Sequence, residues 1–459
     1  MPYKCVESKH NLLANPCFNV ACRLQMRKRQ KENTMTNDTA LETPSSASFY
    51  SNHPFYILEK DSAAAFFEPV VSVHRRGVLG LETVSRALDP SSLDMIEPRE
   101  LFQSLQEEDF YLKLGLDRLF RQKGLEAFCA FQSPNPNLLL FMDIEPSVLE
   151  ENIVGSGYLY KQIEEFHLEP RRVVVQIPLS GKWDPRQVDR FIQIHRRHDL
   201  LLCLKNIHAE PDRLKTVLEF NPDLVKLEEG LTRGLSRSAE KQSALRKVVR
   251  LAHSLGIVVV AGGLDNEEDA LAALELGVDL LQGGYFSRQS KNNPVLTLGR
   301  RARMMFLSAR FRRRLGIQAQ KDRELRRRCE QIGEFASSCF SQKPLDELEI
   351  TAPFLFRQVP ALECLYRLNP VGRQLGKMAL NELHIPKRQR FLFEPSAPGS
   401  DHSLREYFYA LAPDVDKVVT QPYLSMNSGH LCVTVAKCVG NPSGDGFQIL
   451  CADLNLSRV

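Results

Sequence analysis

Between residues 68 and 294 the sequence repeats one pattern, in which a short apolar run is followed by a polar or amphipathic stretch. The apolar runs are PVVSV, VLGLETV, LLLFMDI, RVVVQIPL, LLLCLKNI, DLVKLEE, IVVVAGGL and DLLQGGYF, and helical patterns such as PRQVDRFIQIHRRH separate most of them. Eight buried strands alternating with helices over about 220 residues predict an α/β fold, a TIM-like barrel of strands surrounded by helices. The first two runs leave no room for a helix between them, so we expect an antiparallel first strand pair.

Each of these runs carries a polar residue or a glycine toward its C-terminal end. The carboxyl ends of the strands form the active face of such barrels, so the end residues of different runs are expected to meet in one site. The alternative is that each strand simply stops at a polar residue, which any single position would allow equally well. The candidate site residues are Glu82, Asp143, Gln176, Lys205, Asn206, Lys226, Glu228, Gly262 and Gln282.

The rest of the chain divides by composition. Residues 1–54 are polar and basic without a sustained period and predict a disordered tail, in which the sequence leaves open whether translation starts at Met1 or Met35. Residues 295–345 are rich in arginine and helix formers and predict a helical linker, whose apolar stripe rests on a neighbour or on a second copy. Contact with nucleic acid or anionic membrane is the alternative for this helix. Residues 346–459 hold strand-like segments and turns such as NSG, which predict an α+β domain on an antiparallel sheet.

Composition restricts where the chain acts. The 43% hydrophobic and 25% charged fractions are those of a soluble globular protein, and no stretch approaches the roughly 18 apolar residues of a membrane span. The N-terminus lacks an apolar signal-peptide core, so we expect a cytoplasmic protein with no membrane partner. The eleven cysteines are scattered without a CxxC pair, which indicates reduced thiols. A net charge of +4 is too small to indicate a nucleic-acid partner.

An ordered series of motifs links the barrel to a known family. EPVVSV is followed by GLETVSR, then LVKLE, and finally VVVAGGLDNEEDALAALELGVDLLQGGYFSR. Over residues 55–294 this series resembles the EAL family of cyclic di-GMP phosphodiesterases, with Glu82 at the signature glutamate and Arg86 four residues later. The interval from Lys205 to Lys226 matches, without a gap, the interval from the family's aspartate pair to its lysine. The resemblance implies a barrel mouth whose acids bind two divalent metals, which activate a water for attack on phosphorus.

Several acids of the family's metal site are replaced in this sequence. Gln176 stands for a glutamate, and Lys205 and Asn206 stand for both members of the metal-bridging aspartate pair. Gly262 removes another glutamate, whereas Glu82 is retained. Because hard divalent cations need several anionic oxygens, each replacement weakens the implied site.

Two other positions affect the net charge of the ring of strand-end side chains at the barrel mouth. Asp143 stands where the family has asparagine, and Glu228 stands where it has an aspartate after Lys226. A Lys205 ammonium in the ring would repel divalent cations, because two unit charges near 4 Å interact by on the order of 4 kcal/mol at an intermediate dielectric. It could pair with Glu82 in place of metal. We therefore expect no catalytic residues and no bound metal in this barrel.

Three hypotheses for function follow from the resemblance and the departures. The first is a catalytically inactive receptor that still binds cyclic di-GMP, with Arg86, Glu82, Asp143 and Gln282 as ligand-binding residues. In the family the arginine after the signature glutamate contacts a ligand phosphate; the alternative for Arg86 is a structural ion pair. The second hypothesis is a protein-interaction scaffold that binds no nucleotide. The third is an active phosphodiesterase that needs Mg or Mn.

The C-terminal segment resembles a second kind of module. QPYLSMNSGHLCVTVAKCV, a turn, and GFQILCADLNL follow the order of elements in Cache domains, the PAS-like sensory modules. In some ligand-binding Cache domains a late aspartate contacts an amine, and Asp453 is the candidate here; a simple strand-end aspartate is the alternative. A barrel, a long helix and a PAS-like domain in this order imply a homodimeric signalling protein with a protein partner.

Overall fold

The computed structural model describes residues 54–89, 94–106, 109–130, 137–145, 148–149, 157–179, 184–286, 298–340, 347–384, 395–411, 415–440 and 447–459. The predicted tail and Met35 therefore lie outside the described residues, apart from Pro54. The described residues form two compact units, which divide between Arg313 and Arg314.

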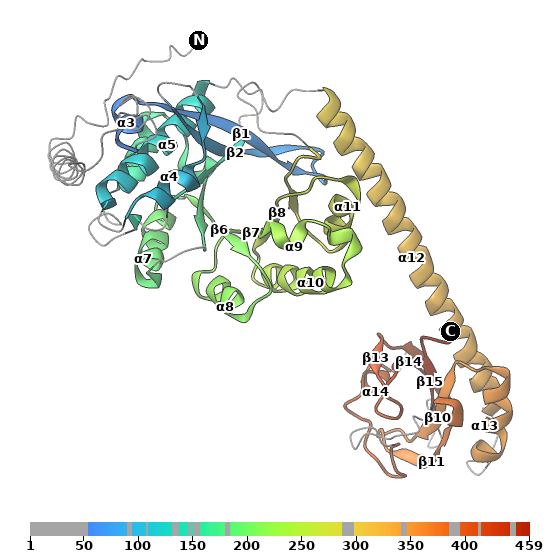
Figure 1. Cartoon of the computed structure of the whole chain (residues 1–459). Helices are drawn as coiled ribbons and strands as arrows, with labels where there is room; N and C mark the ends of the chain where they lie inside the picture. Colours follow the sequence, from blue (N-terminus) through green and yellow to red (C-terminus); the bar gives the residue numbers. More distant parts are fainter. Residues whose placement is uncertain are drawn as a thin grey trace, which may run out of the picture. The chain divides into compact units, whose positions relative to one another are not determined.

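The first unit is a closed barrel to which the described residues contribute eight strands (Figure 1). β1 and β2 pair antiparallel as a hairpin, the following barrel strands pair in parallel, and β9 returns to pair with β1. This arrangement confirms the predicted TIM-like barrel and its antiparallel first pair. The strands are β1 (Ala63–Ser72), β2 (Gly77–Leu88), β4 (Leu139–Asp143), β5 (Val173–Pro178), β6 (Leu201–Ile207), β7 (Leu224–Leu227), β8 (Val258–Ala261) and β9 (Leu280–Leu281), with a short β3 (Met95–Ile96) beside β2.

Helices alternate with the parallel strands, and their starts are encoded locally. The side chains of Asp184, Ser238 and Asn266 each accept a backbone N–H of the helix that follows, which satisfies donors that a helix start leaves free. Apolar helix faces pack on the outside of the strands in one continuous core. The helices are α3 (Pro54–Glu59), α4 (Pro98–Ser104), α5 (Phe110–Ala130), α6 (Tyr158–Glu165), α7 (Pro185–Arg196), α8 (Pro211–Phe220), α9 (Glu229–Thr232), α10 (Ala239–Ser254) and α11 (Glu267–Glu275), with short 3-10 helices η4 (Pro170–Arg172) and η5 (Leu235–Arg237).

The second unit is built on a six-stranded, mostly antiparallel sheet of order β11-β10-β15-β14-β12, with β13 beside β14. The sequence predicted the strand segments in the last part of this unit but missed β10 and β11, because charged residues interrupt their apolar pattern. Between β11 and β12 the described residues form the one-turn helix α14. The elements are α13 (Glu347–Gln358), β10 (Leu362–Leu368), β11 (Gln374–Leu380), η6 (Glu382–His384), α14 (Glu406–Tyr409), β12 (Lys417–Val419), β13 (Tyr423–Leu424), β14 (Leu431–Val439) and β15 (Gln448–Asn455).

The long helix α12 (Leu298–Phe340) contributes to the cores of both units. Leu307 is buried in the barrel's outer core, and Ala336 is buried in the core of the second unit. Its many arginines form local ion pairs, such as Arg327 and Arg328 with Glu324. Among the described residues, no helix combines the length and the apolar character that a membrane crossing requires.

Candidate ligand site at the barrel mouth

The side chains at the barrel mouth are positioned by strand alternation. A layer of apolar side chains fills the barrel interior, including Val70, Phe141, Val174, Cys203, Leu224, Val260 and Leu280. Because side chains of a strand alternate between its two faces, the residue two positions nearer the mouth also faces inward. This relation selects Glu68, Asp143, Gln176, Lys205, Lys226, Gly262 and Gln282, and Glu82 follows Gly80 in the same way.

Gly80 leaves room for the apolar layer below the site. A Cβ atom at Gly80 would lie 2.5 Å from a ring carbon of Phe141, so a larger residue would push that ring away. The side chains at the barrel mouth therefore pack directly above a closely packed apolar layer.

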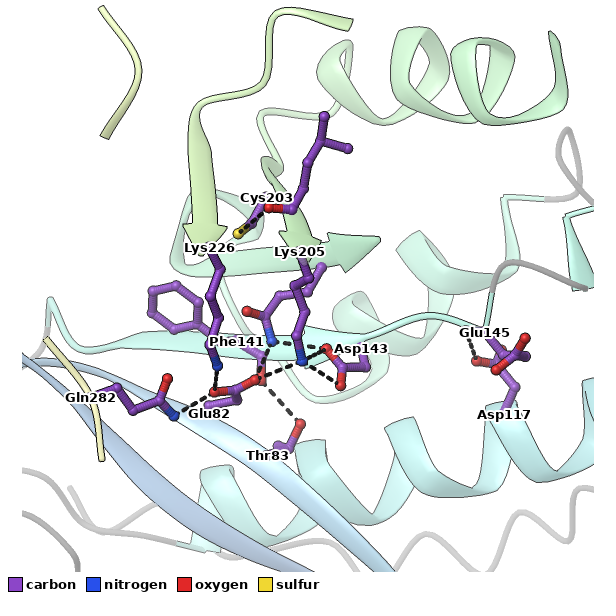
Figure 2. Close-up of polar contacts among 12 residues, drawn as sticks. Glu82, Thr83, Asp117, Phe141, Asp143, Glu145, Cys203, Lys205, Lys226 and Gln282 are labelled. Carbon is purple, nitrogen blue, oxygen red and sulfur yellow. Dashed lines mark hydrogen bonds and ion pairs between the residues drawn. The ribbon is translucent and has the colours of Figure 1, made fainter. Parts of the chain in front are cut away.

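Glu82 is the centre of the site, and its carboxylate is buried and fully engaged (Figure 2). Its Oε1 accepts hydrogen bonds from Gln176 Nε2 at 2.8 Å and Lys205 Nζ at 3.0 Å. Its Oε2 accepts hydrogen bonds from Lys226 Nζ and Gln282 Nε2. Burial by itself raises the pKa of Glu82, but the ammonium groups of Lys205 and Lys226 outweigh it and hold that pKa well below its ordinary value.

Lys205 bridges two carboxylates. Its Nζ lies 3.0 Å from Glu82 Oε1 and 2.8 Å from each oxygen of Asp143. Burial lowers the pKa of Lys205, but the charges of Asp143 and Glu82 reverse this and raise it above its ordinary value. Gln176 Nε2 also donates to Asp143 Oδ1 at 2.9 Å. Lys205 therefore stays protonated. Its ammonium group lies between two carboxylates, a position in which a metal cation would compete with it.

A bulge in β6 determines where Lys205 and Asn206 point. The pairing register of β6 with β7 shifts between Leu204 and Ile207. Asn206 has a left-handed φ of 61°, a conformation that asparagine tolerates better than most residues. Bulges commonly redirect a side chain beside a functional site. Here the bulge follows Lys205, which projects into the ring, while Asn206 turns the chain.

Gly262 lies beside the Lys226 side chain. Lys226 Nζ pairs with Glu82 Oε2, and a Cβ atom added at Gly262 would lie 3.1 Å from Lys226 Cε. A glutamate at position 262, as the resemblance implies for active relatives, would crowd the present path of the Lys226 side chain. A residue larger than glycine at position 262 would therefore require the Lys226 side chain to shift by a few tenths of an ångström.

Glu68 is a mouth residue that the sequence argument missed. It lies in β1 directly opposite Glu82 in the hairpin register. Burial, followed by the negative charge of Glu82, raises the pKa of Glu68 to about 7. The signal was available in the sequence: β1 runs antiparallel, so its mouth end lies before Val70, and the inward-facing residue there is Glu68.

The raised pKa of Glu68 predicts a pH effect of definite sign. The folded state favours protonated Glu68, so its contribution to stability is full below pH 4.5 and is lost as the pH rises through about 7. Glu68→Gln imitates the protonated form, and we expect it to match the natural protein at pH 4 and to be more stable by roughly 1–3 kcal/mol at pH 8. Urea unfolding across this range measures the difference. Glu59→Gln, on an exposed residue, is the control; parallel curves for Glu68→Gln and the natural chain would contradict the assignment.

Besides Asn206, three predicted residues do not join the ring. Arg86 is paired with Glu97 at 2.7 Å and donates to the carbonyl of Ser85, as in the structural alternative. Glu228 is exposed at the residue that precedes α9. Asp453 lies in the second unit, where it is buried.

Asp453 is surrounded by hydroxyl and thiol groups. Its Oδ1 accepts from Thr434 Oγ1 at 2.7 Å, and its Oδ2 accepts from Cys364 Sγ at 3.2 Å. Burial raises the pKa of Asp453 to about 6. The side chain thus belongs to the polar interior of the sheet.

The ring does not fit the two divalent metals that the resemblance implies. Both oxygens of Glu82 already accept two donors each, and both oxygens of Asp143 accept from Lys205. The carboxylates of Glu82 and Asp143 are balanced by the ammonium groups of Lys205 and Lys226. A cation would have to displace these ammonium groups without a full set of acidic oxygens to bind it.

Comparison with known proteins matches the barrel to a protein family. A family model for the EAL domain matches residues 56–289. The chain is 23% identical over 236 residues, half of its length, to the cyclic di-GMP phosphodiesterase RocR of Pseudomonas aeruginosa. It is 23% identical over 234 residues to YkuI of Bacillus subtilis, an uncharacterised EAL-domain protein. The chain spans 58% and 56% of the lengths of these relatives.

A solved structure resembles more of the chain than the barrel. The crystal structure of Bacillus subtilis YkuI matches with a TM-score of 0.68 and 19% identity, covering 87% of this chain and 98% of that one. At this identity the likeness shows the fold, which extends beyond the barrel into the second unit.

Proposed function

The chain belongs to the EAL domain family, and from this premise we propose that its barrel is a catalytically inactive receptor for cyclic di-GMP. The proposed inactivity rests on the position of the Lys205 ammonium group between the carboxylates of Glu82 and Asp143. An ammonium group there occupies the oxygens that would hold metal, and neither Lys205 nor Asn206 supplies an acidic ligand. With no metal to activate water, hydrolysis by the family's route has no nucleophile.

Two comparisons support nucleotide binding. RocR is named a cyclic di-GMP phosphodiesterase, and the YkuI crystal structure holds substrate cyclic di-GMP with calcium. A cyclic dinucleotide carries two phosphates, for which an arginine fork is a suitable partner. Arg86 is the candidate, and it must exchange Glu97, whose side chain is half exposed, for a ligand phosphate.

The exchange of partners by Arg86 makes the receptor proposal testable with a matched pair of variants. We expect isothermal titration of the full chain with cyclic di-GMP to give micromolar or tighter binding that is unchanged by magnesium or EDTA. Arg86→Ala should weaken binding about tenfold or more, because a charge-assisted hydrogen bond is lost. Glu97→Gln should tighten binding up to about fivefold, because it releases Arg86 from a partly exposed ion pair.

The same samples separate the competing functions. Chromatography after the titration should show intact cyclic di-GMP with magnesium or manganese. Metal-dependent linear product that disappears in Glu82→Ala would replace the receptor by an active phosphodiesterase. An absence of heat up to high ligand concentration, with a folded protein, would leave the scaffold for a protein partner.

The finer organisation is also part of the proposal. We propose that residues 346–459 form a Cache- or PAS-like sensory module, residues 295–345 a helical linker, and residues 55–294 the degenerate barrel of a cytoplasmic homodimer that acts on a protein partner. The antiparallel sheet of the second unit and the continuous helix α12 support this reading. Ligand binding to either unit would then affect the other unit through the linker.

A further inference from the structure

The second unit contains a group of metal-ligand side chains that the receptor function does not use. Glu363 lies in β10, His384 ends η6, and His430 lies in the turn before β14. One potential ligand atom from each residue lies within 4.8 Å of those of the other two. Three segments distant in sequence therefore bring two imidazoles and a carboxylate together.

Glu363 is a buried carboxylate held by neutral donors. Ser425 Oγ donates to its Oε1, while Ser428 Oγ at 2.7 Å and Cys432 Sγ at 2.9 Å donate to its Oε2. Its exposed fraction is 2%, and among the residues the structure describes no lysine or arginine forms an ion pair with it. A buried negative charge is costly unless a cation balances it, so this position favours a bound cation.

His384 has the tautomer and support of a metal ligand. Its Nε2 lies 2.7 Å from the carbonyl oxygen of Pro360 and must donate to it, which leaves the lone pair on Nδ1. Metal-binding histidines commonly donate their other ring N–H to a carbonyl in this way. Asn455 Nδ2 donates to Nδ1 at 3.0 Å, so this weak neutral hydrogen bond is what a metal would replace.

His430 provides the solvent-accessible side of the site. It is exposed, whereas Glu363 and His384 are both buried. Its ring centroid lies 6.2 Å from that of His384, with the planes at 82°. Donor atoms around a tetrahedral zinc ion lie about 3.3 Å apart, and rotation of the His430 side chain is the movement that would close the present spacing.

We propose that Glu363, His384 and His430 bind one divalent transition metal of the zinc class, with a fourth position open to water or a small ligand. Two imidazole nitrogens and one carboxylate oxygen form a donor set that suits zinc. Calcium and magnesium prefer all-oxygen sites, so they fit these residues poorly. The metal would tie β10, η6 and the turn before β14 together.

The experiment is a zinc titration of the full chain against a chromophoric chelator. We expect the natural chain to bind one more equivalent of zinc than His430→Gln, or to bind that equivalent at least thirtyfold more tightly. The exposed position of His430 keeps the variant folded. His253→Gln, on a partly exposed histidine of the barrel that pairs with Asp279, should bind like the natural chain. All other cysteines and histidines are common to these proteins, so the difference isolates this site.

A cobalt titration and a thermal scan test the donor set and the effect on folding. Cobalt should give four-coordinate visible bands without sulfur-to-metal charge transfer, and zinc should raise the unfolding temperature of the second unit by several degrees in the natural chain but not in His430→Gln. Equal zinc binding in His430→Gln and the natural chain would overturn the site. A sulfur band that disappears in Cys432→Ser would overturn the proposed three-residue donor set.

Discussion

Lys205→Met is expected to lower the free energy of unfolding of the barrel by about 2–4 kcal/mol near neutral pH. Lys205 is 16% exposed and contacts Glu82 and both oxygens of Asp143. Methionine keeps much of the side-chain volume but removes the positive charge, so Glu82 retains only Lys226 as a cationic partner. Removing one member of a buried ion network leaves an uncompensated charge, which is more destabilising than losing a surface pair.

Urea unfolding at two pH values distinguishes this charge effect from altered packing. The pKa of Glu82 lies below its ordinary value, so its ionised form contributes stability above pH 4.5 that is lost as the pH falls. The difference between Lys205→Met and the natural chain should therefore be full at pH 7 and shrink below pH 4.5. Lys215→Met, on an exposed residue of α8 paired with Glu219, should cost less than about 0.5 kcal/mol. A Lys205→Met protein as stable as the natural chain at pH 7 would refute the central role of this ion pair.

The barrel and most of its mouth could be predicted because strand pattern and chain order define them. Eight apolar runs correspond to the eight barrel strands, and the residue at each run's end gave Glu82, Asp143, Gln176 and Lys205 as neighbours. The sequence allowed Lys205 to pair with Glu82, and in the structure Lys205 Nζ and Glu82 Oε1 lie 3.0 Å apart.

Other features were missed, either because the direction of a strand was not taken into account or because they depend on contacts that one sequence does not display. Glu68 was missed because a strand that enters the barrel antiparallel presents its first half to the mouth. The space shared by Gly262 and Lys226 requires knowledge of side-chain paths across two strands. In the second unit, Glu363 lies within an apolar strand pattern, and neither its partners nor the two nearby histidines are close to it in sequence.

Restoring the family's acids together is expected to create a divalent-metal site in this barrel. The variant carries Gln176→Glu, Lys205→Asp, Asn206→Asp and Gly262→Glu. It adds four carboxylates at the barrel mouth and removes the ammonium group that bridges Glu82 and Asp143. We expect Mn²⁺ to bind roughly a hundredfold more tightly than to the natural chain, because several acidic oxygens then converge without a cation among them.

The substitutions must be combined because the present residues support one another. Gly262→Glu alone would crowd Lys226, whose Cε lies within 3.1 Å of the new Cβ position, and would disturb its pairing with Glu82. Lys205→Asp alone places another acid beside Glu82 and Asp143 without enough ligands to bind metal. Both single variants should therefore be less stable than the natural chain and gain little affinity for Mn²⁺.

A counterpart that carries uncharged residues at the same positions isolates the role of the carboxylates. Lys205→Asn combined with Gly262→Gln removes the ammonium group and fills the space at position 262, but it adds no acid to the ring. Paramagnetic titration with Mn²⁺ should detect the new site in the fourfold variant and not in this counterpart. Mn²⁺ should also raise the unfolding temperature of the fourfold variant alone, because only that protein carries crowded acids that a bound cation relieves. A folded fourfold variant that binds Mn²⁺ no better than the natural chain would show that loss of acids is not what separates this barrel from metal. The loop after Lys205, NIHAEPDRL, would then be the next feature to examine.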